Sequence, residues 1–161
     1  MSKKKPYDQD FKLETVRLVK EQGRSVKSVA NDLGVHEITI YKWLRQHNEE
    51  GDIVLKELGK ILLKICRNFD IVSRNGGEEF SVMLIDCHPQ QAISIAERIR
   101  SNVEQNAFIL SNGKIISITV SIGIAIYPDT TLDLSRLIKE ADNALYKAKQ
   151  TGRNKVVLAG S

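Results

Sequence analysis

The sequence predicts an α+β protein in which a small helical domain precedes a mixed domain of helices and strands. Apolar residues recur at helical spacing in three short segments of residues 1–50. After them, helical patterns alternate with β-branched runs in the order helix, strand, strand, helix, strand, helix, strand. No linker rich in Gly, Ser or Pro separates the halves, but the composition changes at Glu50 and Gly51. We therefore expect domains at residues 7–50 and 51–161, preceded by a disordered tail at residues 1–6.

Three short helices are expected in the first domain. The first contains Phe11 and stops before Gly23. The second covers residues 26–33 and is capped by Ser25, and the third covers residues 36–46.

The segment from Val26 to Arg45 has the spacing of a helix-turn-helix. Ala30 is small where the two helices must cross, and Gly34 tolerates the positive φ of a sharp turn. Ile40 supplies the apolar anchor of the second helix. The pattern favours a DNA-binding motif, whose second helix enters the major groove. A helical module for protein contacts, with ordinary solvated charges, is the alternative.

The second domain is expected to alternate helices and strands. A helix is indicated by apolar residues spaced three or four apart, and a strand by β-branched residues bounded by turn residues. The expected elements are a helix at 52–68, strands at 70–74 and 79–86, a helix opened by Pro89, a strand at 115–127, a helix from Leu134 to Ala148, and a strand at 155–158.

Composition and charge exclude several classes of protein. Charged residues make up 27% of the chain and apolar residues 42%, as in globular rather than disordered proteins. No apolar stretch is long enough to span a membrane, and Met1 is not followed by a secretion signal. Cys66 and Cys87 have no disulfide or zinc spacing and read as reduced thiols of a cytoplasmic protein. The net charge of +4 gives only weak support for a nucleic-acid partner.

The first domain resembles a known DNA-binding family. The matching segments are Phe11-Lys-Leu-Glu-Thr-Val-Arg-Leu-Val, Gly23-Arg-Ser-Val, Ala30, Leu33-Gly and Ile40-Tyr-Lys-Trp. They are similar to the amino-terminal domain of insertion-sequence transposases, which binds the terminal repeats of the element. The family's separate integrase-type domain has no counterpart here, so the resemblance implies DNA binding without transposition.

Contacts to DNA can be assigned to the exposed front of the second helix of the motif. His36, Glu37, Thr39 and Lys42 are expected near base edges or phosphates. Lys12, Arg17, Lys27 and Arg45 are expected to contact phosphates, which position the domain without reading sequence. Trp43 is expected in the core rather than in base stacking.

The central motif of the second domain is Arg74-Asn-Gly-Gly-Glu-Glu-Phe80. Two glycines at a hairpin tip allow the backbone to approach a phosphate closely, because they carry no Cβ. The adjacent carboxylates of Glu78 and Glu79 are hard oxygen ligands of the kind that Mg²⁺ prefers. The motif thus indicates a phosphate site that uses magnesium, although so short a pattern also occurs in plain surface turns.

Three sequence patterns that flank this motif allow the family of the second domain to be identified. They are Gly-Asp-Ile-Val-Leu beginning at Gly51, Val120-Ser-Ile-Gly-Ile-Ala, and Ala141-Asp-Asn-Ala-Leu-Tyr-Lys-Ala-Lys-Gln-Thr-Gly-Arg-Asn154. With the central motif they resemble the carboxy-terminal part of the GGDEF (diguanylate cyclase) domain, a family of bacterial signalling enzymes. The resemblance implies an incomplete α/β sandwich of the nucleotide-cyclase, ferredoxin-like palm type over residues 51–161.

The same resemblance implies roles for single residues. Asp52 matches a residue that hydrogen-bonds guanine, and Gly76 and Gly77 match the glycines that approach phosphate. Glu78 matches a Mg²⁺ ligand and Glu79 its catalytic neighbour. Lys149 and Arg153 match a basic pair that neutralises the triphosphate, although Lys149 alone also suits the end of a solvated helix.

A second nucleotide site is implied in the same way. Arg67-Asn-Phe-Asp70 has the Arg-x-x-Asp pattern at the family's distance before Gly76, and Arg98 matches a further arginine. In the family these residues bind the product, cyclic di-GMP, and inhibit the enzyme. Arginine suits the role because its planar fork binds guanine edges and phosphates in pairs.

The resemblance also shows what this chain lacks. A complete GGDEF domain begins with a strand that carries a metal-binding aspartate, then a helix and a loop with an asparagine and a Gly-His pair. His47-Asn48 does not reproduce that pattern. We expect the loss of these ligands to abolish synthesis of cyclic di-GMP and the loss of a central strand to leave two strand edges unpaired.

Three hypotheses therefore stand. The first is a degenerate GGDEF domain that binds GTP or cyclic di-GMP, with Mg²⁺ where nucleotide is bound, coupled to a DNA-binding helix-turn-helix. The second is an active diguanylate cyclase that joins two GTP molecules as a homodimer. The third is a fusion remnant or recombined chain that folds but has little function.

Overall fold

The computed structural model describes residues 7–161, which divide into two compact units between Ile53 and Val54. Each unit is described by itself. The disordered tail expected at residues 1–6 lies outside the described residues. No helix of residues 7–161 combines the length and the apolar character that crossing a membrane requires.

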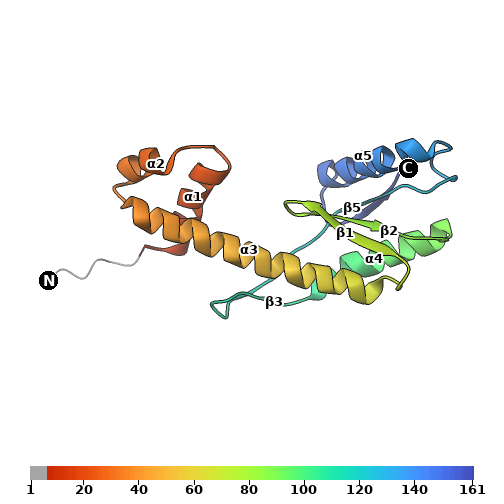
Figure 1. Ribbon diagram of the computed structural model, residues 1–161, viewed down its shortest axis with the longest axis horizontal. Coiled ribbons are helices and arrows are strands. Elements are labelled where there is room, and N and C mark those ends of the chain that lie inside the picture. The colour runs from red at the N-terminus through yellow and green to blue at the C-terminus, as the bar shows by residue number, and fades with distance from the viewer. Residues whose placement is uncertain (1–6) are drawn as a thin grey trace. The chain divides into compact units, whose positions relative to one another are not determined.

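The first unit is helical, with α1 at Gln9–Lys20, α2 at Val26–Leu33 and the start of α3, Glu37–Ile65 (Figure 1). Ser25 caps α2 through a hydrogen bond that its side chain accepts from the amide of Ser28. Gly34 ends α2 in the left-handed region, with φ of +63°, as the sharp turn requires. The expected helix-turn-helix is therefore present.

The core of this unit joins all three helices. Its buried residues are Val16, Val29, Ala30, Val35, Ile40 and Trp43. Trp43 is 7% exposed and meets the rings of Tyr7 and Phe11 edge to face. Trp43 is thus a core residue, as predicted, and is not available for stacking on a base.

One element differs from the prediction. Separate helices were expected at 36–46 and 52–68, but α3 is continuous from Glu37 to Ile65. Gly51 lies inside it, and an isolated glycine in a helix costs only about 1 kcal/mol relative to alanine. No proline interrupts the segment, and the residues on either side favour a helix. The composition change at Gly51 therefore marks no break in the backbone.

The second unit combines the end of α3 with strands and two further helices. After α3 come β1 at Ile71–Gly76, β2 at Glu79–Met83, α4 at Pro89–Gln105, β3 at Phe108–Ile109, β4 at Ile115–Ile116, β5 at Ile122–Ile124, the short helix η1 at Leu134–Arg136, α5 at Leu137–Gln150 and β6 at Val156–Leu158 (Figure 1). The order agrees with the predicted α+β plan.

The strands form three separate two-stranded sheets. β1 pairs with β2 and β3 with β4, both antiparallel, and β5 pairs with β6 in parallel. A single strand was expected over residues 115–127, but only its ends are paired, as β4 and β5. Residues 117–120 alternate between exposed and half-buried side chains, and residues 117–121 have no ladder partner in the described part of the chain. The single long strand expected here is therefore two short strands joined by an unpaired segment.

The second core lies under these strands. Leu58 and Leu62 of α3, Ile99 and Val103 of α4, and Phe108 are its buried residues. Half-buried side chains of β1, β2 and residues 116–122 pack against it. The hairpin and the segment before β5 are thus held on the same helices, although no strand joins them.

Among the glycines of this unit, Gly123 in β5 has the least room for a Cβ. A Cβ built there would lie 2.2 Å from the carbonyl oxygen of Ala141 and 2.2 Å from the amide nitrogen of Leu145. Only a glycine allows β5 to approach α5 so closely. The glycine of the Val120-Ser-Ile-Gly pattern therefore serves packing.

Candidate nucleotide and DNA sites

The hairpin tip has an open backbone. Gly76 pairs with Glu79 across the turn, and the two glycines at the tip have φ of +137° at Gly76 and +55° at Gly77. A Cβ at either glycine would meet nothing within 4 Å, so the backbone faces open space. Glycine is required by the conformation, and the open space leaves room for a ligand against the backbone.

Arg74 holds the tip in this conformation. Its Nε and Nη2 both donate to the carbonyl oxygen of Gly77, at 3.0 and 2.8 Å. These two side-chain hydrogen bonds stabilise the turn in addition to the backbone hydrogen bonds between β1 and β2. Sequence reasoning gave Arg74 no role of its own, although it opens the quoted motif; the register irregularity between Arg74 and Gly76 had no sequence signal.

The two carboxylates of the motif are exposed, and one of them has a basic partner. Lys149 of α5 lies 3.4 Å from Glu79 Oε1. Lys149 and Glu79, which were assigned to one site from the sequence, are therefore neighbours in the structure. Glu78 is exposed at the turn between the strands.

These side chains offer Mg²⁺ an incomplete ligand set. Residues 7–161 contain no group of three or more acidic, histidine or cysteine side chains placed to hold a metal ion. Mg²⁺ commonly binds one or two carboxylates and takes its other ligands from water and substrate phosphates. Glu78 and Glu79 fit a magnesium ion that arrives with a nucleotide, and they do not fit a metal held by protein alone.

Arg153 lies in a loop with an unusual backbone. Gly152, Arg153 and Asn154 all have positive φ, of +112°, +56° and +44°. Two of the three are not glycine, so the conformation has to be stabilised by contacts elsewhere. The Arg153 amide donates to the carbonyl of Ala148 at 3.0 Å, which ties the loop to the end of α5.

A polar network from α4 holds this loop. Asn154 accepts from Arg100 Nη1 at 2.9 Å and donates to Glu104 Oε1 at 2.7 Å. Arg100 also binds Glu97 and Glu104, both at 2.8 Å. The hydrogen bonds from Arg100 and then from Asn154 lower the pKa of the Glu104 carboxyl. Sequence reasoning missed this network because α4 and Asn154 are far apart in the chain.

The three residues of the expected product site lie around the end of α3. The Asp70 carboxylate is fully buried and accepts from the Arg67 amide at 2.7 Å. Its distance to Arg67 Nε is 3.4 Å, and the Arg67 guanidinium lies 4.9 Å from the centre of the Phe69 ring. Arg98 Nη2 donates to the carbonyl of Ile65 at 2.9 Å. The Arg-x-x-Asp turn thus places both arginines beside one helix end.

Part of the Arg67 guanidinium lacks hydrogen-bond partners. Its Nε and Nη2 are buried and donate to no described group with hydrogen-bond geometry. Donors left in this state carry a desolvation cost, which a guanidinium can relieve by turning toward an anion. Cys66 lies next to the turn, where burial and then the Asp70 charge raise the pKa of its thiol and the Arg98 charge opposes them.

Asp52 lies in the first unit, on α3, with an exposed side chain. It was expected at the start of a new helix, but the continuous helix puts it in a helix interior. Its expected hydrogen bond to guanine rests on the family resemblance alone.

The predicted DNA-contacting residues occupy the start of α3. His36 is exposed and its Nδ1 accepts from the amide of Ile38 at 3.3 Å, so its ring caps the helix. Lys42 and Arg45 are exposed farther along the same helix, whereas Glu37 and Thr39 are half-buried.

Two of the expected phosphate contacts already have acidic partners. Arg45 Nε lies 3.6 Å from Glu49, and Arg17 lies 2.8 Å from Glu21 and 3.9 Å from Glu14. These pairs are well exposed, so each is weak and can exchange for a phosphate.

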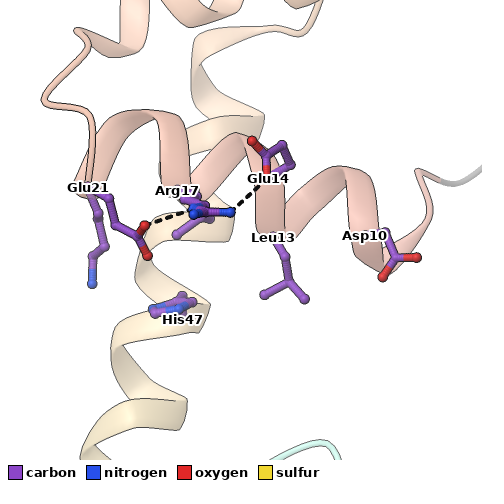
Figure 2. A pocket seen from close by; sticks show the side chains of 8 residues that line it. Asp10, Leu13, Glu14, Arg17, Glu21 and His47 are labelled. Atoms are coloured by element: carbon purple, nitrogen blue, oxygen red, sulfur yellow. Dashed lines mark hydrogen bonds and ion pairs between the residues drawn. The ribbon is translucent and has the colours of Figure 1, made fainter. Parts of the chain in front are cut away.

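A shallow pocket of about 450 Å³ lies between α1 and α3 of the first unit (Figure 2). In Figure 2, dashed lines join Arg17 to both Glu14 and Glu21, and His47 is drawn on the neighbouring helix. Its charges are of both signs and largely neutralise each other. Of the residues expected to contact DNA, Arg17 lines this pocket, whereas His36, Glu37, Thr39, Lys42 and Arg45 do not.

Comparisons with known families agree with both resemblances. Residues 47–155 match the family described as diguanylate cyclase, GGDEF domain, and residues 1–60 match a transposase helix-turn-helix family. The fusion inferred from the sequence is therefore present in this chain.

Curated relatives match the second half of the chain. An uncharacterized protein, YhcK of Bacillus subtilis, is 50% identical over 109 residues, 68% of this chain and 30% of that protein. Diguanylate cyclase A of Treponema denticola is 45% identical over 109 residues, 68% of this chain and 29% of that protein. The chain thus spans about 30% of the length of these two relatives.

Solved structures of the same kind are similar in fold. The GGDEF domain of YfiN (TpbB) from Pseudomonas aeruginosa superposes with a TM-score of 0.67 at 27% identity, covering 97% of each chain. The active GGEEF domain of a diguanylate cyclase from Vibrio cholerae gives 0.60 at 24% identity, covering 92% of this chain and 91% of that one. At 24% identity the second likeness supports the fold alone.

Proposed function

The chain belongs to the GGDEF (diguanylate cyclase) domain family through residues 47–155, and from that premise we propose that it is a guanine-nucleotide-binding protein whose helix-turn-helix binds DNA. The ligand is cyclic di-GMP at Arg67, Asp70 and Arg98, with GTP and Mg²⁺ at the hairpin as a further ligand. The observation that carries the proposal is the grouping of those three residues around the end of α3.

The chemistry of this group suits a dinucleotide. Two arginines supply paired donors for phosphate oxygens and for the Hoogsteen edge of guanine. The buried Asp70 carboxylate fixes the turn through the Arg67 amide, so the backbone is set before ligand arrives. Arg67 Nε and Nη2, which make no hydrogen bond, gain acceptors when the side chain turns to a phosphate.

The hairpin suits binding of a triphosphate better than its turnover. Gly76 and Gly77 leave the backbone open, and Lys149 supplies positive charge close to Glu79. Joining two nucleotides by a two-metal mechanism needs a fuller set of carboxylates than this hairpin offers. We therefore propose binding without cyclisation in the isolated chain.

An active cyclase is the second candidate, favoured by the 45% identity to Diguanylate cyclase A of Treponema denticola. Its test is incubation of the protein with GTP and Mg²⁺ and detection of cyclic di-GMP by mass spectrometry. Product that disappears in Glu78→Ala would establish the cyclase and would refute binding without turnover.

The binding proposal is tested by titrating cyclic di-GMP into the purified full chain by calorimetry. Wild-type protein is expected to bind saturably, and Arg67→Ala to lose the binding. Arg136→Ala removes an arginine that lies outside the site, is more exposed than Arg67 and pairs with Glu140 on α5, and it should bind as wild type does. Loss of heat in both variants, or no heat from folded wild-type protein, would refute the site.

The DNA proposal is tested separately, by mobility shift with duplexes enriched from a random library. Lys42→Ala should weaken binding of all duplexes about equally, because a lysine that contacts phosphate carries no sequence information. Adding cyclic di-GMP to the same assay shows whether the two activities are coupled. If the protein shifts no duplex even at low salt, the DNA-binding proposal is refuted.

A further inference from the structure

The start of α3 exposes two large apolar side chains that the fold does not use. Ile38 is 72% exposed and Tyr41 57% exposed, whereas Ile40 and Trp43 on the same helix are 0% and 7% exposed. Residues three apart on a helix share a face, so Ile38 and Tyr41 form one apolar patch. Burial in the core therefore explains Ile40 and Trp43 but not the apolar character of Ile38.

The patch is bordered by cations on the same helix. Lys42 lies four residues after Ile38 and Arg45 seven, and both are exposed. That spacing places all three on one side of α3. An apolar spot beside cationic side chains is complementary to a groove with a negative backbone and uncharged base edges, which is what duplex DNA presents.

The position of Ile38 within the helix is also the relevant one. His36 caps α3 through the Ile38 amide, so Ile38 lies in the first turn. In helix-turn-helix proteins the residues at the start of the second helix are those that reach base edges. Among the base edges of the major groove, thymine alone presents an apolar group, its C5 methyl.

The geometry points to Ile38 as a specificity-determining residue that recognises a thymine methyl group in the bound duplex. This inference rests on the proposed DNA binding and extends it to one base. Tyr41 continues the apolar surface on the same face, and Lys42 and Arg45 hold the phosphates. The DNA-contacting set inferred from sequence did not include Ile38.

The test replaces thymine by uracil, which removes only the methyl group. Duplexes are first enriched from a random library with the full-length protein, and each thymine of the recovered site is then replaced in turn. At one position wild-type protein should bind the uracil duplex about fourfold more weakly, the effect of exposing one methyl-sized apolar group. Ile38→Ala should bind thymine and uracil duplexes equally at that position.

The control is Ile138→Ala on α5, because Ile138 is also 72% exposed and lies outside the motif. It should keep the wild-type response to uracil, and both variants should unfold at the wild-type temperature. Wild-type protein that ignores uracil at every position, or Ile38→Ala that keeps the full response, overturns the inference. Binding without enrichment of any sequence overturns it too but leaves DNA binding standing, whereas no binding refutes both.

Discussion

Gly123→Ala tests the packing of β5 on α5. The added Cβ would lie 2.2 Å from two backbone atoms of α5, and real Cβ atoms essentially never come closer than 3.0 Å. The helix would therefore have to move by at least 3.0 − 2.2 = 0.8 Å. The obstacles are backbone atoms, so no rotamer change relieves the contact. Overpacking of this kind costs about 3 kcal/mol at the upper end of its usual range.

A compensating gain reduces the net effect. Alanine restricts the unfolded chain and stabilises by about 0.4–1 kcal/mol where its conformation is tolerated. We therefore expect Gly123→Ala to lower the free energy of unfolding by about 2 kcal/mol or more. The measurement is urea denaturation followed by far-UV circular dichroism, with wild type and variant compared at equal protein concentration.

The matched control is Gly59→Ala in α3. A Cβ there would meet only Phe80 Cε1, at 3.9 Å, which is ordinary van der Waals contact. Gly59 lies in a helix, where alanine is favoured by about 1 kcal/mol, so this variant should be neutral or more stable. Surface substitutions usually change the free energy of unfolding by no more than about 0.5 kcal/mol. If Gly123→Ala changes it by no more than that, the close approach of β5 and α5 is wrong.

Three further predictions concern α3, the polar network around Glu104 and the hairpin of β1 and β2. Gly51→Ala should stabilise the protein by about 0.5–1 kcal/mol in thermal denaturation, because Gly51 is helical and a Cβ there meets nothing within 4 Å; destabilisation would argue against a continuous helix. Because the folded-state pKa of Glu104 is lowered, its stabilising effect is present above its ordinary value of 4.5 and is lost as the pH falls through the lower folded value. Glu104→Gln should therefore differ from wild type in urea stability at pH 6 and approach it in strong acid, whereas a constant difference would exclude the ionised carboxylate as the cause. Arg74→Ala should weaken GTP binding in Mg²⁺, measured by calorimetry, without changing cyclic di-GMP binding, since Arg74 holds only the carbonyl of Gly77; equal loss of both ligands would point to general unfolding.

Local signals account for what the sequence predicted well. Two glycines between β-branched runs specify the hairpin tip at Gly76 and Gly77, and Ser25 and Gly34 bound α2 through capping and turn chemistry. These features depend on neighbours in the chain, so they can be inferred without knowing the fold. Helical spacing and β-branched runs supplied the order of the remaining elements.

Long-range features could not be predicted in the same way. A strand needs a partner, and the β-branched composition of residues 117–121 does not reveal that none is adjacent. The contact between Arg100 and Asn154 joins residues 54 apart in the sequence. The composition changes at Gly51, and this change was wrongly taken as a break between two helices. Arg67, Asp70 and Arg98 could be assigned to one place in advance because the family resemblance supplied their spacing.

The division of the strands into three separate sheets has a consequence for local opening. β1 and β2 exchange backbone hydrogen bonds with each other, and β5 exchanges them with β6, so no ladder transmits the opening of one pair to the other. Each pair then behaves as its own cooperative unit, coupled to the other through side-chain packing on α3 and α4. In hydrogen–deuterium exchange, a ligand at the hairpin should protect the amides of residues 71–83 and leave those of 122–124 at their unliganded rate.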